Sequence, residues 1–590
     1  MDNVTIEYIK SIKPTPRYSG KELLEEGRKI GNSFKAGRGK FIQKNSDKYS
    51  CWMDYKKECA KSGKLIWMIL IGLATLEDEC DAFRKLREFS DRTGLELNLV
   101  QAIPSCNVGI PKECRDSVPD TTSFMLDGWE DYQKMQDAAT FDLSLIDHHL
   151  FVPNAIETTI NALKLGCSRV GSFTQFSWGY QGFSDEVKRC EDTVRALGIM
   201  ASKKDEMFSV ESYLDDGFPG YFMDCSSYVG FSLLEKYILE DLCGVNYTIS
   251  YGGLLSDGAP RLAIAVALHK LLSTDEKLVI SYVNSSTNLQ WDHDIHGNYG
   301  VSCQEFLLAM LVEKHYKMGM GLNPVSITEK VAVPTLQDLL DIFAAGKRVE
   351  EKVGDWDIFM DFTAFDEIVD VMMREGKILF ENALSSMKEA GINIEDPLEM
   401  ILLLKDFNPV QFERLFHSTT FGKENKEVKP FYPTVLGRQT VAMTDEIMEQ
   451  LREEGLEGSL EGKSVVVASA DAHSYGLLLV SNVLSAMGAS VVNGGVSMDA
   501  PELLDLADEE GIGYVAVSCH NGQALDYGKQ LLALAEKRGK EYCFIMGGKM
   551  NAILEGHSEP IEVDHMLREI GVNANNDLCK TVKIIRDTNF

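Results

Sequence analysis

Residues 463–476 read KSVVVASADAHSYG, and this stretch decides the fold of the C-terminal part of the chain. Its first half is a compact run of β-branched residues that predicts a buried strand, and an apolar helical run follows at 477–487. Residues 471–476, with the pattern D-x-H-x-x-G, therefore form a strand-to-helix loop. Such a loop presents its side chains at the carboxyl end of a strand, where doubly wound domains bind ligands.

The same alternation of strand and helix continues toward the C-terminus. Strands are expected at 489–492, 514–518 and 542–546, and helices at 500–510 and 523–538. The pattern predicts a small doubly wound, Rossmann-like α/β domain.

The loop carries residues suited to holding a metal. The imidazole of His473 can coordinate a metal ion, while Asp471 holds the other ring N–H and fixes the tautomer. Gly476 lets the backbone pass close to a bulky ligand. The alternative is an ordinary surface pair, because so short a pattern also occurs by chance. Two further strand ends favour a ligand site: Ser518 begins the run SCHNGQ, and residues 546–549 read MGGK.

These three motifs in this order resemble the cobalamin-binding domain of base-off/His-on enzymes, most closely the small subunit of glutamate mutase, over residues 463–585. The resemblance implies that His473 is the lower cobalt ligand, with Asp471 as its hydrogen-bond partner, and that Ser518, Gly547 and Gly548 line the pocket of the nucleotide tail. The full implied cofactor-binding set is Asp471, His473, Ser474, Tyr475, Gly476, Ser518, His520, Gly522, Gly547 and Gly548.

Two places depart from this family. His520 stands where an apolar residue is common, and we interpret it as a polar pocket residue and not as a second metal ligand. Residues 573–577, NANND, replace the usual Pro-Gly-Thr-like adenine loop.

From about residue 65 to 324 the chain repeats strand and helix, which predicts a parallel sheet covered by helices. Strand-like runs occur at 64–71, 96–103, 141–145, 221–223, 246–250 and 278–282, and helical runs at 77–93, 155–165 and 258–272. A closed (β/α)8 TIM-like barrel is favoured, with an open sheet as the alternative. The expected domains are an N-terminal extension at 1–60, the barrel at 61–345, a helical segment and linker at 346–440 and the cobalamin-binding domain at 441–590. The polar stretch 419–434 is the best linker candidate.

Three segments of the barrel half carry a second resemblance: QFSWGY at 175–180, GVNYTISYGG at 244–253, and LNP at 322–324 leading to VPT at 333–335. They are weakly similar to the large subunit of glutamate mutase, over about residues 65–347. A chain that pairs such a barrel with a C-terminal cobalamin-binding domain is similar to 2-methyleneglutarate mutase. The resemblance implies an adenosylcobalamin-dependent carbon-skeleton mutase, an isomerase whose adenosyl group and substrate meet near Trp178, Tyr180, Tyr251 and residues 323–330, including Glu329. Trp178 and Tyr180 could instead be core aromatics. The alternative function is the corrinoid protein of a methyltransferase.

The substrate is expected to be a small molecule, with a slight preference for a carboxylate other than glutamate. The alternative is a substrate with an amine, hydroxyl or other donor group, which a pocket lined by Asp147 and the two histidines after it would favour. The arginines that grip two carboxylates in glutamate mutase have no counterpart here, and Arg115, Arg169 or Lys330 would have to replace them. Asp147 and His148, followed by His149, come directly after a strand-like run, which in a barrel is the catalytic face. They are candidates for acid–base or anchoring roles, and the alternative is a buried polar pair.

The charge composition of the chain limits the classes of partner that it is expected to bind. Lys and Arg number 59 against 90 Asp and Glu, giving a formal charge of −31 that disfavours nucleic acid and anionic membranes. The cysteines show no CxxC pairs and no signal-peptide core is present, so a cytoplasmic enzyme with reduced thiols is expected. Family analogy favours a homodimer or larger homo-oligomer.

Overall fold

The structure is a computed structural model, and it describes residues 3–118, 123–180, 182–215, 217–252, 255, 258–285, 291–329, 334–419, 428–471, 474–496, 498–519, 524–552 and 561–590. The chain forms two compact units. The barrel unit comprises Met1–Phe176 and Asp185–Val435, and the C-terminal unit comprises Ser177–Ser184 and Leu436–Phe590. The main part of the C-terminal unit begins at Leu436, whereas the sequence predicted that the cobalamin-binding domain begins at residue 441.

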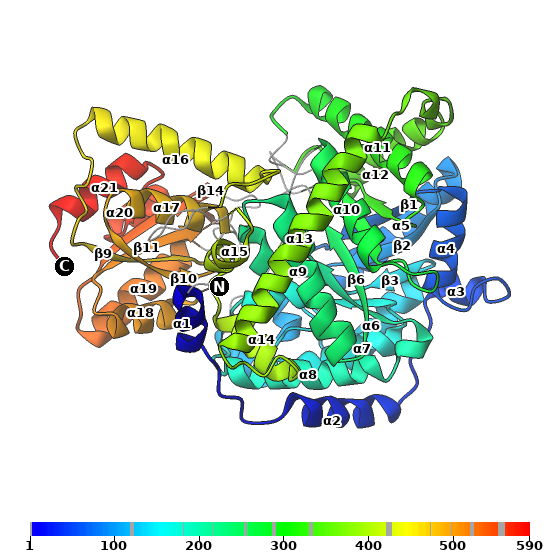
Figure 1. Ribbon diagram of the computed structural model, residues 1–590, viewed down its shortest axis with the longest axis horizontal. Helices are drawn as coiled ribbons and strands as arrows, with labels where there is room; N and C mark the ends of the chain where they lie inside the picture. Colours follow the sequence, from blue (N-terminus) through cyan, green and yellow to red (C-terminus); the bar gives the residue numbers. More distant parts are fainter. Residues whose placement is uncertain are drawn as a thin grey trace. The chain divides into compact units, whose positions relative to one another are not determined.

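Eight parallel strands form the barrel, in the order β3-β2-β1-β8-β7-β6-β5-β4 (Figure 1). A bridge between Leu145 and Val170 joins β3 to β4, so that the sheet closes. The strands are β1 (Ile66–Ile71), β2 (Leu97–Ala102), β3 (Asp142–Ser144), β4 (Arg169–Gly171), β5 (Ser209–Tyr213), β6 (Asn246–Tyr251), β7 (Ile280–Asn284) and β8 (Gly321–Asn323). The predicted (β/α)8 barrel is confirmed.

Helices surround this barrel as the repeat requires. They are α5 (Leu76–Thr93), α6 (Trp129–Ala138), α7 (Ala155–Leu165), α8 (Glu186–Ala201), α9 (Cys225–Lys236), α10 (Gly258–Leu272) and α11 (Ile295–Tyr316). The predicted strand at 221–223 is wrong, because the 3-10 helix Phe218–Tyr221 and a loop occupy this stretch. The strand of this repeat is β5, which lies earlier in the chain.

The N-terminal extension covers the barrel with α1 (Asn3–Ser11), α2 (Gly20–Asn32), α3 (Lys40–Lys44) and α4 (Trp52–Ser62). Helix α2 packs so tightly on α8 that a Cβ on Gly27 would overlap the carbonyl oxygen of Arg195. From α4, the buried Lys56 Nζ donates to the carbonyl oxygens of Leu278 and Ile280, where β7 begins. The extension therefore closes the amino-terminal end of the barrel.

Four helices follow β8: α12 (Leu336–Glu350), α13 (Thr363–Glu389), α14 (Pro397–Asp406) and α15 (Pro409–Phe416). The long α13 packs along α9 and α10, and Figure 1 shows it crossing in front of them. Glycines allow the close approach to α9, since a Cβ on Gly376 would lie 2.9 Å from the Gly230 nitrogen. This segment belongs to the barrel unit.

The C-terminal unit is a doubly wound α/β fold, as predicted. Its parallel sheet has the order β10-β9-β11-β12-β15. The strands are β9 (Ser464–Ser469), β10 (Ser490–Gly495), β11 (Tyr514–Cys519), β12 (Cys543–Gly548) and β15 (Asn573–Ala574), and the helices are α16 (Val435–Glu453), α17 (Ser474–Ala486), α18 (Ala500–Glu509), α19 (Ala524–Arg538), α20 (Asp564–Glu569) and α21 (Leu578–Asp587). This flavodoxin-like order has its topological switch point between β9 and β11, where such folds bind ligands.

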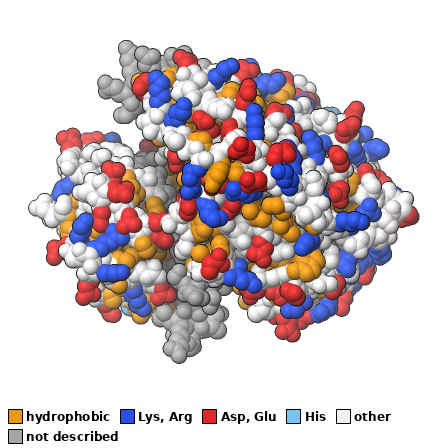
Figure 2. Space-filling view, turned by 90° about the horizontal axis from the view of Figure 1, so that it is seen from below, with side chains coloured by type: hydrophobic (Ala, Val, Ile, Leu, Met, Phe, Trp, Pro, Cys, Tyr) orange, Lys and Arg blue, Asp and Glu red, His pale blue; other side chains and the backbone are white. Residues whose placement is uncertain are grey.

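On the face that Figure 2 shows, acidic and basic side chains are interspersed. In the described part of the chain, every helix is too short or too polar to cross a bilayer.

Candidate functional site

The carboxyl end of the barrel carries a hydrogen-bonded arc centred on Asp147, which follows β3. Gln175 Nε2, from the 3-10 helix after β4, donates to Asp147 Oδ1 at 2.8 Å, and Gln101 Nε2 on β2 lies 3.4 Å from Asp147 Oδ2. Gln101 shares the face of Leu99, which packs in the barrel interior with Met68. Asp147 is therefore held at the barrel mouth by two amide donors.

Burial raises the pKa of Asp147 to about 6, and the nearby Glu211 charge acts in the same direction. The two amide hydrogen bonds oppose this shift because they stabilise the carboxylate. The residue as a whole is half-buried. Asp147 is thus a carboxylate that titrates close to neutral pH, as a general acid or base requires.

A second arc continues around the mouth on the other strands. Asn284 Nδ2 at the end of β7 donates to the Tyr213 hydroxyl oxygen at 2.8 Å, and Asn323 Nδ2 on β8 donates to Asn284 Oδ1 at 2.9 Å. The Leu70 N–H on β1 donates to Asn323 Oδ1 at 3.1 Å. Gly252 is required beside them, because a Cβ there would lie 2.7 Å from the Tyr213 hydroxyl.

The two histidines after Asp147 have different environments. His149 is fully buried, with Nδ1 2.7 Å from the Asp147 carbonyl oxygen and Nε2 2.9 Å from the Tyr132 hydroxyl on α6. Since a carbonyl only accepts, Nδ1 carries the proton, and His149 is a satisfied core histidine that faces α6. His148 has a left-handed backbone (φ 59°), and its N–H donates to Gln175 Oε1 at 3.3 Å. Burial lowers the pKa of His148 to about 3 and of His149 to about 4, so both imidazoles are neutral at pH 7.

Arg115 and Arg169, the two arginines considered for binding substrate carboxylates, both form ion pairs within the protein. Arg169 Nη1 lies 3.2 Å from Glu211 Oε1 inside the barrel, and Arg169 also contacts Ser281 and Ser144. Arg115 bonds Asp127 and the carbonyl oxygens of residues 108 and 110. Lys330, the third candidate, lies outside the described residues.

The remaining predicted barrel residues are spread out. Trp178 and Tyr180 are buried, but they lie in Ser177–Ser184, which belongs to the C-terminal unit. Tyr251 points toward α10, where its hydroxyl donates to the Arg261 carbonyl oxygen at 2.6 Å. Glu329 follows β8 and is exposed, and its N–H donates to the Ser326 carbonyl oxygen. Of the predicted catalytic residues, Asp147 and His148 alone share a described hydrogen-bonded group, around Gln175.

The switch point of the C-terminal unit brings three predicted cofactor residues together. Ser518 at the end of β11 pairs in register with Ser469 on β9 and with Gly547 on β12. Asp471, buried, follows β9 by two residues, and the Ala470 N–H donates to the Ser518 carbonyl oxygen at 2.9 Å. These residues form one row across the carboxyl ends of three neighbouring strands.

This row fits the tail of a corrinoid in two respects. The Ser518 hydroxyl is buried and has no hydrogen-bond partner among the described residues, so a bound ligand could satisfy it. Gly547 and Gly548 leave the end of β12 without side chains, and Gly548 has a left-handed φ of 100°. Residues 573–577, whose sequence departs from that of the cobalamin-binding family, contact this glycine pair. The Gly548 N–H donates to Asn576 Oδ1 at 2.6 Å.

Other cofactor residues are described only in part. His473, His520 and Gly522 lie outside the described residues, and of the Ser474 side chain nothing is described. Ser474 and Gly476 lie in the first turn of α17, directly after the loop. Tyr475 is half-buried, and its hydroxyl contacts Met443 on α16.

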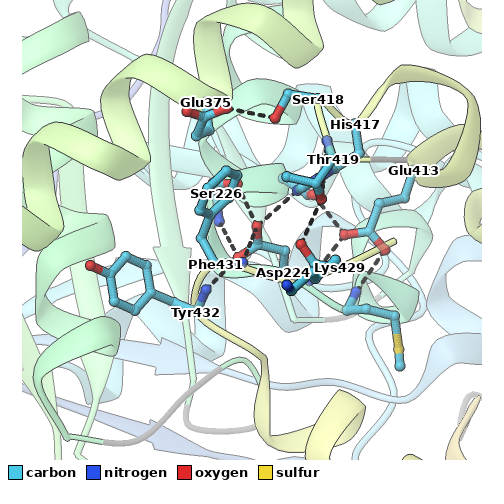
Figure 3. Close-up of polar contacts among 12 residues, drawn as sticks. Asp224, Ser226, Glu375, Glu413, His417, Ser418, Thr419, Lys429, Phe431 and Tyr432 are labelled. Carbon is cyan, nitrogen blue, oxygen red and sulfur yellow. Dashed lines mark hydrogen bonds and ion pairs between the residues drawn. The ribbon is translucent and has the colours of Figure 1, made fainter. Parts of the chain in front are cut away.

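A buried polar cluster, drawn in Figure 3, fixes the end of the barrel unit. The fully buried Asp224 carboxylate, after β5, accepts bonds from the backbone N–H groups of Phe431 and Tyr432 and from His417 Nε2 at 2.8 Å. Because the Thr419 N–H points at His417 Nδ1, the ring proton lies on Nε2, facing Asp224. The second half of the expected linker is therefore docked on the barrel unit and is not a free tether.

The neighbouring Glu413 on α15 completes this cluster. Its carboxylate accepts bonds from the backbone N–H groups of Met223 and Asp224 and from the Ser227 hydroxyl. Beyond it, the Val435 N–H donates to the carbonyl oxygen of Leu255, which follows β6. The barrel unit thus ends at the carboxyl-terminal loops of β5 and β6.

Comparison with known proteins gives fold-level likeness only. No family model matches the chain, and no curated protein matches it. Solved structures that match include a cobalamin-binding protein from Desulfitobacterium hafniense (13% identity, 41% of this chain and 91% of that one, TM-score 0.19). Others are the dihydropteroate synthase of Xanthomonas albilineans (14%, 49% and 96%, TM-score 0.27) and the carboxyl transferase domain of Rhizobium etli pyruvate carboxylase with pyruvate (12%, 75% and 60%, TM-score 0.31). Scores this low do not establish a shared function.

Sequence reasoning missed the mouth residues Gln101, Tyr213 and Asn284, and it included Asn323 only within the expected substrate region at 323–330. Each is a polar residue at or next to the last position of a strand. A polar residue at the end of a strand is therefore the signal that could have identified them, but β5 and β8 were not predicted as strands.

Proposed function

We propose that the chain is a cobalamin-dependent enzyme, and specifically an adenosylcobalamin-dependent mutase of small molecules. His473 would be the lower cobalt ligand, Asp471 its hydrogen-bond partner, and Ser518, Gly547 and Gly548 the lining of the tail pocket. Adenosylcobalamin supplies a carbon radical by homolytic cleavage of its cobalt–carbon bond. The protein's own residues would bind and orient the substrate at the barrel mouth.

The observation that carries the cobalamin proposal is the buried, unpartnered Ser518 hydroxyl at the switch point, in register with Gly547. A buried hydroxyl without a partner costs roughly 1–3 kcal/mol, so its position needs a reason. A polar ligand entering at the strand ends gives one. Asp471, which follows β9, lies at the same switch point, and His473 of the same sequence motif has the side chain that would suit cobalt.

The chain leaves the barrel unit at the carboxyl ends of its strands. The chain passes between the two units after Phe176, before Asp185 and after Val435. The first crossing follows β4, and Val435 is bonded to the loop after β6, so these crossings lie at the carboxyl end of the barrel. That end is where barrel enzymes carry out their chemistry.

The alternative function is methyl transfer by a corrinoid protein. The arc of Gln101, Asp147 and Gln175 favours an enzyme with its own substrate site over a pure cofactor carrier. Incubation of the adenosylcobalamin-loaded protein with a substrate that it converts should give a Co(II)-coupled radical signal in electron paramagnetic resonance. Methyl transfer from methylcobalamin, with no such signal, would favour the alternative.

Cofactor binding itself is tested by variants of two strand serines. Adenosylcobalamin is added to the full chain, free cofactor is removed by gel filtration, and retained cofactor is measured by absorbance. Loss of one polar contact and the added methyl groups in Ser518→Val should weaken binding about ten-fold or more. Ser464→Val, at the opposite end of β9, is the matched control and should bind as wild type. Equal retention by the two variants, or none by wild type, would refute the proposal.

A further inference from the structure

We infer that the barrel mouth binds the protonated amine of a small-molecule substrate, between the Gln101 amide oxygen and the Asp147 carboxylate. The inference rests on the proposed function, because it names the substrate class of the same enzyme. Its evidence is a set of hydrogen-bond acceptors at the end of β2 and after β3.

Gln101 has an unsatisfied acceptor inside the barrel. The side chain is 1% exposed, and its Oε1 is buried without a hydrogen-bond partner among the described residues. Its Nε2 is already directed at Asp147 Oδ2. A donor from a ligand would recover the roughly 1–3 kcal/mol that a buried, unpaired acceptor costs.

The orientation of this amide is set by its neighbour. If the Gln101 amide were flipped, its oxygen would lie 3.4 Å from Asp147 Oδ2, and two acceptors would face each other. Gln175 fixes the other carboxylate oxygen from the opposite side, with Nε2 2.8 Å from Asp147 Oδ1. Gln101 Oε1 therefore stays available as an acceptor next to a carboxylate.

The charge balance at this point calls for a cation. In the described structure, amides are the hydrogen-bond donors to Asp147, and the charge that acts on its pKa is another carboxylate, Glu211, which is paired with Arg169. A half-buried carboxylate without a counter-ion is costly, and an ammonium group would neutralise it. An ammonium group also brings three donors, enough for the carboxylate and for Gln101 Oε1 together.

A dicarboxylate fits the same place poorly. Its oxygens would meet acceptors at both Gln101 and Asp147, and the arginines considered for it, Arg115 and Arg169, are engaged elsewhere. A hydroxyl donor could reach the two acceptors but would leave the carboxylate charge unpaired. The mouth is therefore selective for an amine.

The test uses the full chain with n-butylammonium chloride and disodium glutarate as probes, and binding is followed by ligand-observed saturation-transfer NMR at pH 7.5. The amine should bind, and glutarate should bind at least about ten-fold more weakly or not at all. Asp147→Asn and Gln101→Leu should each weaken amine binding about ten-fold or more. Asp137→Asn on the exposed face of α6 is the matched carboxylate-to-amide control and should leave it unchanged.

Two variants are used because Asp147→Asn also removes a charge that Gln175 binds, and Gln101→Leu keeps the test informative if that variant fails to fold. Equal amine binding by wild type and Gln101→Leu, no amine binding by wild type, or preferred binding of glutarate would each overturn the inference. Cobalamin retention is measured on the same preparations. Retained cobalamin without amine binding refutes the amine site alone, whereas loss of cobalamin binding in wild type refutes the proposed function.

Discussion

Arg169 on β4 and Glu211 on β5 form an ion pair inside the barrel, with side chains 4% and 0% exposed. Arg169→Met leaves the Glu211 carboxylate buried without its partner, and we expect the free energy of unfolding to fall by about 3–5 kcal/mol. The double variant Arg169→Met/Glu211→Gln should recover part of this loss, as measured by urea unfolding. Unchanged stability of Arg169→Met, together with loss of substrate binding, would instead make Arg169 a substrate residue.

Two glycine-to-alanine changes should act in opposite directions. Gly198→Ala places a Cβ onto the Leu24 carbonyl oxygen and forces α2 away from α8, so the unfolding free energy should drop by about 2 kcal/mol or more. Gly300 lies within α11 with open space around it, and Gly300→Ala should raise the unfolding free energy by about 0.5–1 kcal/mol. Equal effects of the two changes would contradict the packing described for α2.

The Asp224 cluster fixes the end of the barrel unit, and limited proteolysis with chymotrypsin reports on it. In Asp224→Asn, the amide NH2 group faces donors such as the Phe431 N–H, so the segment that begins at Lys429 should detach. Chymotrypsin should then cut after Phe431 about ten-fold faster, since cleavage follows the population of the open form. Asp361→Asn, on the exposed surface, serves as the control. An unchanged cleavage rate would mean that Asp224 does not hold this segment.

His149 should make stability depend on pH in the acid range. Burial lowers its pKa in the folded protein to about 4, below the unfolded value of 6.5. The unfolded chain therefore takes up the proton first, and the stability contributed by the neutral ring is lost as pH falls from 6.5 toward 4. Relative to His149→Gln, wild type should lose roughly 2–3 kcal/mol between pH 7 and 4.5 in urea unfolding. The same difference at both pH values would contradict a buried neutral His149.

Local sequence patterns predicted much of the fold. The helices α7 and α10 begin and end where apolar periodicity placed them, and β9 and β11 agree within two residues, because each buries a continuous apolar run. The strands β4 and β8, which have three residues each, were missed, and so was the five-residue β5. Tyr221–Met223 was mistaken for a strand because an aromatic-rich run packs equally well in a buried loop.

The candidate site was less predictable than the fold. Asp147 could be placed at the barrel mouth because it follows a strand, but its partners Gln101 and Gln175 lie far away in sequence. The adjacent His149 faces α6 because the chain turns at His148, which has a positive φ. Whether a polar residue faces the barrel mouth or a helix depends on such turns, and the residue types alone do not predict them.

The coordination of cobalt by His473 is the central claim, and electron paramagnetic resonance of the Co(II) form tests it most directly. The full chain is loaded with cobalamin, reduced to Co(II) and compared with His473→Ala. Wild type should show superhyperfine splitting from one imidazole nitrogen, and the splitting should be absent in the variant. Failure of wild type to retain cobalamin, or the same nitrogen splitting in His473→Ala, would contradict the account.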